Sequence, residues 1–359
     1  MRRPDIPVLT SLRFPAALAI VLLHYLSADD RYRLPPEWEG LTSGVSFFYV
    51  LSGFILYYNY YDMTDRVTFW VARIARIWPV HLVTLALAFL LLPFPALLGH
   101  ASWPMTLPAN MLLVQAWLPF KGSALSYNGV AWSLSVEVFF YLLFPWILAA
   151  MLRVGSLPLL AGSLALGLAA VLVVNGLMPQ LTDFKSFSPV ARLFEFVVGM
   201  SVCRIFLRRG QELKSTRWGT LWEMLAAVGV IALTLPVRSW LLELTGGASL
   251  VEWFITSFSS LGFGMLIWIF AQQTGLLSRW LGHPFLVLWG EISFSVYMCH
   301  QVLLRFIFFH IRPSGDQTLW VALIYFALTL ALSYVLFRWV ETPGRHQIIK
   351  TYRSWHARA

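Results

Sequence analysis

Apolar residues gather along most of the chain in runs of about 20, the length that crosses a bilayer as an α-helix. Short segments with Pro, Gly, Trp or charged residues separate the runs, as is typical of helix ends and membrane interfaces. The pattern predicts an all-α, polytopic membrane protein with about ten transmembrane helices. The expected spans cover residues 9–27, 43–61, 77–98, 132–152, 157–176, 189–207, 220–236, 254–271, 285–309 and 318–339.

The composition agrees with a membrane protein. Of the 359 residues, 58% are hydrophobic and 12% are charged, whereas soluble domains average about 45–50% and about 25%. The apolar runs leave no room for a soluble domain. We therefore expect one transmembrane domain over residues 1–359, with short cytoplasmic tails at 1–8 and 346–359. The basic start resembles a signal peptide, but no small-residue cleavage site follows it, so the first span is expected to remain.

The basic residues predict the orientation. Most of the 26 lysines and arginines lie in segments on the same side as the N-terminus, and cytoplasmic loops carry such an excess, so both termini are expected in the cytoplasm. The formal charge of +9 requires no nucleic-acid partner, because the basic residues lie between spans; the expected partner is the lipid bilayer. Cys203 and Cys299 fall in different spans, near opposite sides of the membrane, which argues against a disulfide between them.

Arg13 and His24 are eleven positions apart in the first span. Eleven helical steps of about 100° return to nearly the same face, roughly 16 Å along the axis. A guanidinium and an imidazole within a membrane span are costly and indicate a functional site. This pair suggests a site that binds an anion at one end and moves a proton at the other.

Glu137 and His300 fall in other spans at a depth similar to that of His24, in the outer half of the membrane. The three could share one site. Each of these residues could instead have a structural role: His24 could form a hydrogen bond to a neighbouring helix, and Glu137 could form an ion pair with Arg192. Glu195 is a second possible partner for Arg192, because it lies three residues further on.

Two further groups are ambiguous. Ser293, Tyr297 and His300 follow i, i+4, i+7 spacing and share one helix face, which could serve chemistry or helix packing. Arg73 and Arg76 precede the third span on one face; they could bind phosphates or anchor the cytoplasmic interface.

The loop 99–131 is rich in Trp and Pro and poor in charge. It could form a lid or acceptor platform on the outer face, or be a plain connection. We find no P-loop, no Rossmann glycine pattern and no GxSxG turn, and no metal is expected because no ligand spacing such as HExxH occurs.

Seven segments together carry a resemblance to a known family. They occur in the family's order and reach from residue 12 to 345: LRFPAALAIVLLHY, GVSFFYVLSGFILYY, RIARIWPVH, WSLSVEVFFYLLFPW, RLFEFVVG, GEISFSVYMCHQ and VETPGR. The chain resembles acyltransferase family 3, transmembrane proteins of bacteria that acylate cell-surface glycans and related acceptors. It resembles the membrane domain only, since few residues follow Arg345 and no fused SGNH-type domain is expected.

The resemblance implies an enzyme of the bacterial cytoplasmic (inner) membrane. It would transfer an acyl group, usually acetyl, from cytoplasmic acyl-CoA to a hydroxyl of an extracytoplasmic glycan or related acceptor. His24 matches the family's motif histidine, the presumed base, and Glu137 its acidic residue. The candidate catalytic residues are His24, Glu137, Tyr297 and His300. The candidate acyl-CoA-binding residues are Arg13, Arg73 and Arg76. The candidate acceptor-binding residues are Trp132, Ser135 and Arg192.

A mechanism follows from this topology, because the thioester and the acceptor approach from opposite sides. An extended phosphopantetheine arm is about as long as the Arg13–His24 separation, so arginines could hold the phosphates while the thioester reaches the imidazole. Either His24 or His300 could be the base, and a covalent acyl-histidine stays open. A proton-coupled transporter or flippase is the alternative function, and a purely structural membrane subunit is a third.

Overall fold

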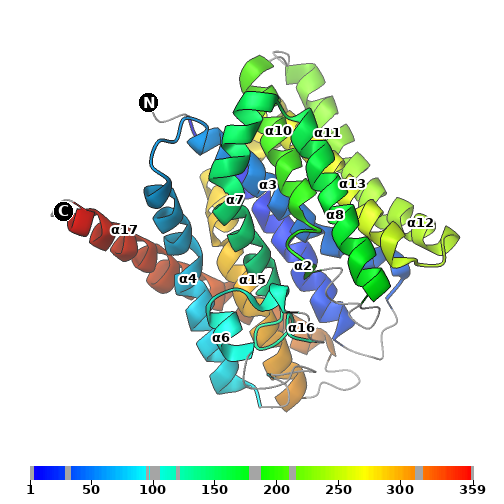
Figure 1. Cartoon of the computed structure of the whole chain (residues 1–359). Helices are drawn as coiled ribbons and strands as arrows, with labels where there is room; N and C mark the ends of the chain where they lie inside the picture. Colours follow the sequence, from blue (N-terminus) through cyan, green and yellow to red (C-terminus); the bar gives the residue numbers. More distant parts are fainter. Residues whose placement is uncertain are drawn as a thin grey trace. The chain divides into compact units, whose positions relative to one another are not determined.

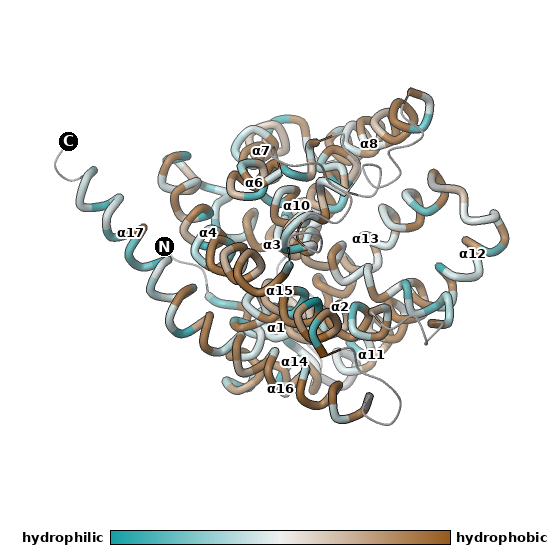
Figure 2. Tube along the Cα trace, turned by 90° about the horizontal axis from the view of Figure 1, so that it is seen from below, coloured by the Kyte–Doolittle hydropathy of each residue, from teal (hydrophilic) through white to brown (hydrophobic). Residues whose placement is uncertain are grey.

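The computed structural model describes residues 4–28, 34–93, 97, 106–118, 122–177, 187–209, 216–311 and 318–356. Within these residues every regular element is a helix (Figure 1). Nine helical stretches of this part are long and apolar enough to cross a membrane. Figure 2 shows that hydrophobic residues make up much of most helices. The predicted all-α, polytopic fold class is confirmed.

The elements include short 3₁₀ or π segments, which carry the letter η. In chain order they are α1 (Pro7–Ser11), α2 (Arg13–Ser27), η1 (Pro36–Ser43), α3 (Gly44–Tyr60), α4 (Arg66–Leu91), α6 (Thr106–Met111), η2 (Gln115–Trp117), α7 (Trp132–Val154), α8 (Leu157–Leu177), α10 (Leu193–Arg209), α11 (Thr216–Ala232), η3 (Leu233–Val237), α12 (Arg238–Leu244), α13 (Ser249–Ala271), α14 (Leu276–Leu281), α15 (Pro284–His310), α16 (Thr318–Leu336), η5 (Phe337–Glu341) and α17 (Thr342–His356).

The predicted span 189–207 differs from the other nine. It corresponds to α10, which has 17 residues and lies at the short end of the range for a membrane span. Most of its residues are buried, including Glu195 and Arg204. α10 is therefore a central helix of the bundle.

The third helix starts earlier than predicted. α4 begins at Arg66, because the side chain of Asp65 accepts hydrogen bonds from the amides of Val67 and Thr68 and caps its first turn. Arg73 and Arg76 therefore lie inside α4, whereas the sequence predicted an apolar span that starts only at residue 77.

The last helix also extends further than predicted. η5 and α17 continue α16 without a break to His356, where a short tail was expected. Hydrophilic and hydrophobic residues alternate along α17 (Figure 2), and none of its residues is buried. Residues 1–3 and 357–359 of the expected tails lie outside the described residues.

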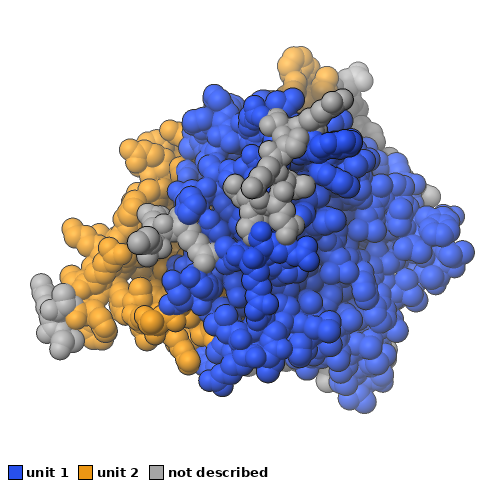
Figure 3. Space-filling model, turned by 90° about the horizontal axis from the view of Figure 1, so that it is seen from above, with its two compact units in different colours: residues 1–62, 146–291 blue, residues 63–145, 292–359 orange. Residues whose placement is uncertain are grey.

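The chain forms two compact units, which Figure 3 colours separately. Unit 1 is Met1–Asp62 with Trp146–Glu291, and unit 2 is Met63–Pro145 with Ile292–Ala359. α7 and α15 each contribute residues to both units. The single domain expected from the sequence stays a prediction.

In unit 1, α3 and α10 pack with their backbones in close approach. A Cβ added to Gly199 would overlap the carbonyl oxygen of Val50, and one added to Gly53 would overlap that of Phe196. Small residues permit such contact between membrane helices. This helix pair positions Ser46 and Glu195, which are part of the polar network described below.

In unit 2, part of the loop 99–131 is buried against helices. Tyr127 packs with Leu85 of α4 and Val302 of α15 and adopts a left-handed backbone with φ 58°. Its amide donates to Leu97 O at 2.5 Å, and its carbonyl accepts from Arg305 Nη1 at 2.6 Å. The described part of the loop is therefore fixed to the unit. Residues 99–105 and 119–121 lie outside the described residues.

Candidate active site

In unit 1, α2 carries both Arg13 and His24. Arg13 is its first residue, and His24 lies in its last turn. Because the helix is unbroken between them, they occupy nearly one face, roughly 16 Å apart along the axis. The predicted shared helix is confirmed, whereas the roles of the two side chains stay predictions.

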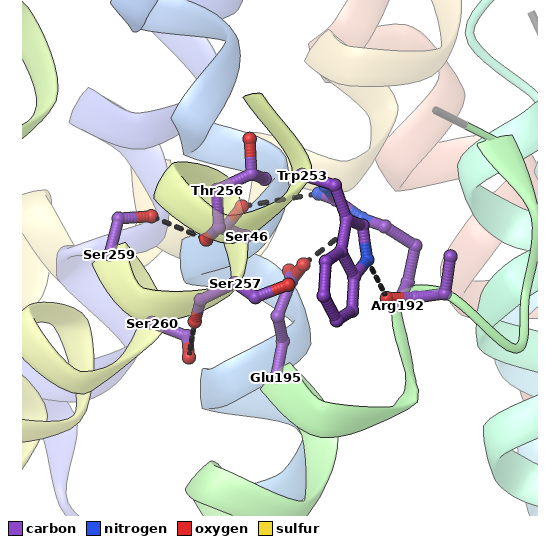
Figure 4. Close-up of polar contacts among 9 residues, drawn as sticks. Ser46, Arg192, Glu195, Trp253, Thr256, Ser257, Ser259 and Ser260 are labelled. Atoms are coloured by element: carbon purple, nitrogen blue, oxygen red, sulfur yellow. Dashed lines mark hydrogen bonds and ion pairs between the residues drawn. The ribbon is translucent and has the colours of Figure 1, made fainter. Parts of the chain in front are cut away.

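A buried polar network surrounds Arg192, the residue before α10 (Figure 4). Its Nε lies 3.2 Å from Oε1 of Glu195, and its Nη2 donates to Ser46 Oγ of α3 at 3.1 Å. The ring of Tyr49 lies 5.4 Å from its Cζ. Trp253 of α13 donates its indole N–H to the carbonyl of the residue before Arg192 at 2.9 Å. Three helices thus meet around one ion pair.

This geometry confirms the pairing of Arg192 with Glu195. Glu195 is fully buried and the Arg192 side chain is 9% exposed, so each charge depends on the other for stabilisation. Glu137, the other partner considered for Arg192, belongs to unit 2. Binding of substrate by Arg192 stays a prediction.

Sequence reasoning overlooked hydroxyl residues of α13 near this ion pair. Figure 4 shows Ser257 beside the Glu195 carboxylate. On the same helix, Ser259 donates to the carbonyl of Thr256 at 2.7 Å, and Ser260 donates to that of Ser257. Such bonds within a helix permit hydroxyl residues in an apolar segment. Four hydroxyl residues within 256–260 were the available signal.

In unit 2, Arg73 and Glu137 contact the same tyrosine. The Cζ of Arg73 lies 5.8 Å from the ring centroid of Tyr141 and from that of Phe69. The Tyr141 hydroxyl donates to Oε1 of Glu137, and Trp70 donates to the Tyr141 carbonyl at 3.0 Å. The sequence placed Arg73 and Glu137 at different depths, but the structure brings them to one aromatic side chain.

Arg76 forms an ion pair that the sequence analysis did not anticipate. Its Nη1 lies 3.0 Å from Oε1 of Glu341, the last residue of η5. Glu341 is buried, and its other oxygen accepts from Ser295 Oγ at 2.8 Å. The available signal was the segment VETPGR, which contains Glu341 but reveals no partner.

His300 and Tyr297 lie on the buried face of α15, with ring centroids 5.8 Å apart. His300 Nδ1 is 2.7 Å from the Tyr297 carbonyl oxygen. A carbonyl oxygen only accepts, so Nδ1 donates in this contact. The Tyr297 hydroxyl is 2.9 Å from Ser133 Oγ and donates to the Val130 carbonyl at 3.2 Å. The predicted stripe is confirmed as buried, and its catalytic role stays a prediction.

The described part of the loop contributes buried amides near this stripe. Asn128 donates to the carbonyl of Met298 on α15 at 2.8 Å. The side-chain amide of Asn110 donates to Ser126 Oγ at 2.8 Å. The backbone carbonyl oxygen of Asn110 is 2.7 Å from Nε2 of the buried His81. Hydrophobic periodicity does not report on such polar side chains, so the sequence analysis did not anticipate these contacts.

Trp132 and Ser135, the remaining acceptor-binding candidates, lie in the first turn of α7. Ser135 is fully buried, and its Oγ accepts from the amide of Ala116 in the loop at 3.4 Å. Both residues therefore lie where the loop meets a helix. Acceptor binding by either one stays a prediction.

Other chemistries find little support among the described residues. No group of three or more His, Cys, Asp or Glu side chains in this part could hold a metal ion. Cys203 and Cys299 are both buried, and neither takes part in a disulfide, as the sequence predicted. The described polar groups suit charge stabilisation and proton transfer.

Comparison with known proteins supplies the family. A family model described as "Acyltransferase domain" matches residues 6–338, which include helices of both units. The chain is 31% identical over 329 residues to "Acyltransferase MdmB" of Streptomyces mycarofaciens, covering 84% of this chain and 79% of the relative. It is 23% identical over 389 residues to "O-acetyltransferase OatA" of Staphylococcus aureus, covering 97% of this chain but 58% of the relative. No solved structure matches at a significant level. The family match spans nearly the whole chain, and the chain therefore belongs to acyltransferase family 3, whose members are multi-pass membrane acyltransferases.

Proposed function

We propose that the protein transfers an acyl group, most simply acetyl, from cytoplasmic acyl-CoA to a hydroxyl of an extracytoplasmic glycan or related acceptor. The observation that carries the proposal is the family match over residues 6–338, because it includes every helix that holds a candidate site residue. The host membrane is the bacterial cytoplasmic membrane in this proposal.

The donor is proposed from the basic residues within the helices. Arg13, Arg73 and Arg76 belong to membrane-spanning helices in which a charge is costly. Guanidinium groups bind phosphate through aligned donors, and acyl-CoA supplies phosphates and a thioester on one molecule. Arg73→Ala and Arg76→Ala should raise the KM for acyl-CoA more than the KM for the acceptor.

The chemistry is a direct acyl transfer. The acceptor oxygen attacks the thioester carbonyl carbon, the C–O bond forms and the C–S bond breaks, and CoA leaves as the thiolate. An imidazole takes the hydroxyl proton and returns it to the thiolate, because its ring nitrogens can both accept and donate a proton. His24 is proposed as this base. His300, which is buried on α15 beside Tyr297, is the alternative.

The acceptor class is proposed from the relatives. OatA is an O-acetyltransferase by name, which supports an oxygen acceptor and an acetyl group. Trp132, Ser135 and Arg192 are the proposed acceptor contacts, and Tyr297 is proposed to stabilise the oxyanion that forms on the thioester carbonyl. Glu137 is proposed to orient or charge-balance the imidazole.

The test is turnover by the purified full-length protein with radiolabelled acetyl-CoA and a panel of soluble and lipid-linked glycans. His24→Ala should lower kcat by about 10²–10⁴-fold, the usual contribution of a general base. His300→Ala at the same assay decides between the two histidines. His310→Ala is the matched control, because this histidine is exposed at the end of α15.

Two outcomes would overturn the proposal. One is wild-type protein that forms no labelled product with any acceptor. The other is equal product from wild type, His24→Ala and His300→Ala. Movement of an acceptor across vesicles without a covalent change would instead favour the transporter alternative.

A further inference from the structure

Glu341 is a buried carboxylate that joins three elements of unit 2. Its Oε1 lies 3.0 Å from Nη1 of Arg76 on α4, and its Oε2 accepts from Ser295 Oγ of α15 at 2.8 Å. Glu341 itself ends η5. Ser295 is fully buried, so the hydroxyl that fixes the carboxylate is itself fixed by packing. Both carboxylate oxygens therefore have a defined partner.

The two members of the ion pair differ in exposure. The side chain of Arg76 is 20% exposed, and that of Glu341 is 3% exposed. The ring of Phe294 lies 5.7 Å from the Cζ of Arg76. A guanidinium has five N–H donors in a planar fork, and the ion pair is made through Nη1. An anion can therefore be bound by the same guanidinium while the carboxylate stays in place.

The register of the two helices reinforces this contact. Three residues after Glu341, Gly344 packs on Pro79, which lies three residues after Arg76. A Cβ at Gly344 would lie 2.7 Å from Pro79 Cβ, so the two helices are in close contact there. η5 is a π-helical segment, and such segments are often found at functional sites because the extra residue redirects the side chains that follow. Two contacts at the same spacing fix Glu341 opposite Arg76.

We propose that Glu341 is a positioning residue for donor binding: anchored by Ser295, it holds the Arg76 guanidinium in the orientation that binds a phosphate of acyl-CoA. This inference rests on the proposed function, in which Arg76 binds the donor. A long arginine side chain loses rotamer freedom when it binds an anion, and a partner that fixes it beforehand lowers that cost. The carboxylate also compensates the guanidinium charge when no donor is bound.

The test measures CoA binding by the full-length protein with isothermal titration calorimetry, alongside steady-state kinetics. Glu341→Ala should weaken CoA binding at least about tenfold, as loss of an orienting partner commonly does. The KM for acyl-CoA should rise with it, while the kcat and the KM for the acceptor stay close to wild type. Glu341→Gln should recover part of the loss, because its amide can still accept from Arg76 and pair with Ser295.

Two further variants separate positioning from a general structural role. Ser295→Ala should weaken CoA binding less than Glu341→Ala, since it removes only the anchor. In an Arg76→Ala background, Glu341→Ala should cause no further loss of CoA affinity, because the residue acts through Arg76. Glu243→Gln, at an exposed position of α12, is the control.

The outcomes distinguish this inference from the function it rests on. If wild type binds CoA and Glu341→Ala binds it equally well, the inference is wrong and the proposed function stands. Independent losses in Glu341→Ala and Arg76→Ala would also overturn it. If wild type neither binds CoA nor turns over acetyl-CoA, the proposed function is wrong, and the inference is wrong with it.

Discussion

Two arginines with carboxylate and aromatic partners show how this protein holds charge among apolar helices. Arg192 has Glu195 at 3.2 Å and the Tyr49 ring at 5.4 Å. Arg76 has Glu341 at 3.0 Å and an aromatic ring of α15 at 5.7 Å. The first pair is almost fully buried, whereas Arg76 is 20% exposed. We therefore expect loss of Arg192 to lower the stability of the protein more than loss of Arg76 does.

Replacing Arg192 should be strongly destabilising. Arg192→Ala leaves the fully buried Glu195 without its cation, and breaking a buried pair in this way costs about 3–5 kcal/mol. Thermal and denaturant unfolding of the purified protein in detergent measures the loss. The double variant Arg192→Met, Glu195→Met should recover most of it, because an apolar pair of similar size needs no compensation. A loss below about 1 kcal/mol in Arg192→Ala, the range of exposed pairs, would contradict this interpretation.

At the scale of elements, apolar runs predicted most helices because about 20 apolar residues have few alternatives in a bilayer. The errors occur where other interactions extend a helix. α4 starts early because Asp65 caps basic, amphipathic turns, and α17 continues a span with a largely exposed helix. Neither extension has the continuous apolar character on which the prediction relied.

The N-cap of α4 should depend on pH, because its capping group is the carboxylate of Asp65. The Thr68 hydroxyl, together with the amides of Thr68 and Val67, holds the pKa of Asp65 below its usual value. A folded-state pKa below the unfolded value means that the stabilisation is present above about pH 4 and is lost as the pH falls through the lowered value. Exchange of the Val67 and Thr68 amides should therefore accelerate at low pH, relative to the intrinsic rate. In Asp65→Asn, which can cap without titrating, this protection should not depend on pH.

The close contact of α3 and α10 should not tolerate a methyl group. Gly199→Ala would place a Cβ against the Val50 carbonyl, and the backbone must shift, at a cost of about 1–3 kcal/mol. Gly176→Ala on α8 is the matched control, because no described atom lies within 4 Å of its added Cβ. The control should be neutral or slightly stabilising, since alanine suits a helix better than glycine. Equal melting temperatures for the two variants would be evidence against this packing.

At the scale of the whole molecule, the candidate site could be predicted only in part. The sequence identified ionisable residues within spans, and it offered Glu195 as one of two possible partners for Arg192 because the two residues are three positions apart. It missed Glu341 because that residue is 265 positions from Arg76. Contacts of this kind depend on helix order and register, which hydrophobic periodicity does not specify. The same reason explains why the amides of Asn110 and Asn128 were missed.

The candidate residues are divided between the two units, with His24 in unit 1 and Arg73 and Arg76 in unit 2. The family match over residues 6–338 includes both sets, so each copy of the chain carries all of the proposed residues. The test mixes two impaired proteins in the same proteoliposomes: the His24→Ala variant and the Arg73→Ala, Arg76→Ala double variant. The mixture should show no more acyl transfer than the two variants measured separately. If the site instead drew on two copies of the chain, mixed oligomers would regain an intact combination and activity would recover. The absence of recovery, with both variants folded and inserted as judged by melting temperature, would assign base and donor-binding residues to the same chain.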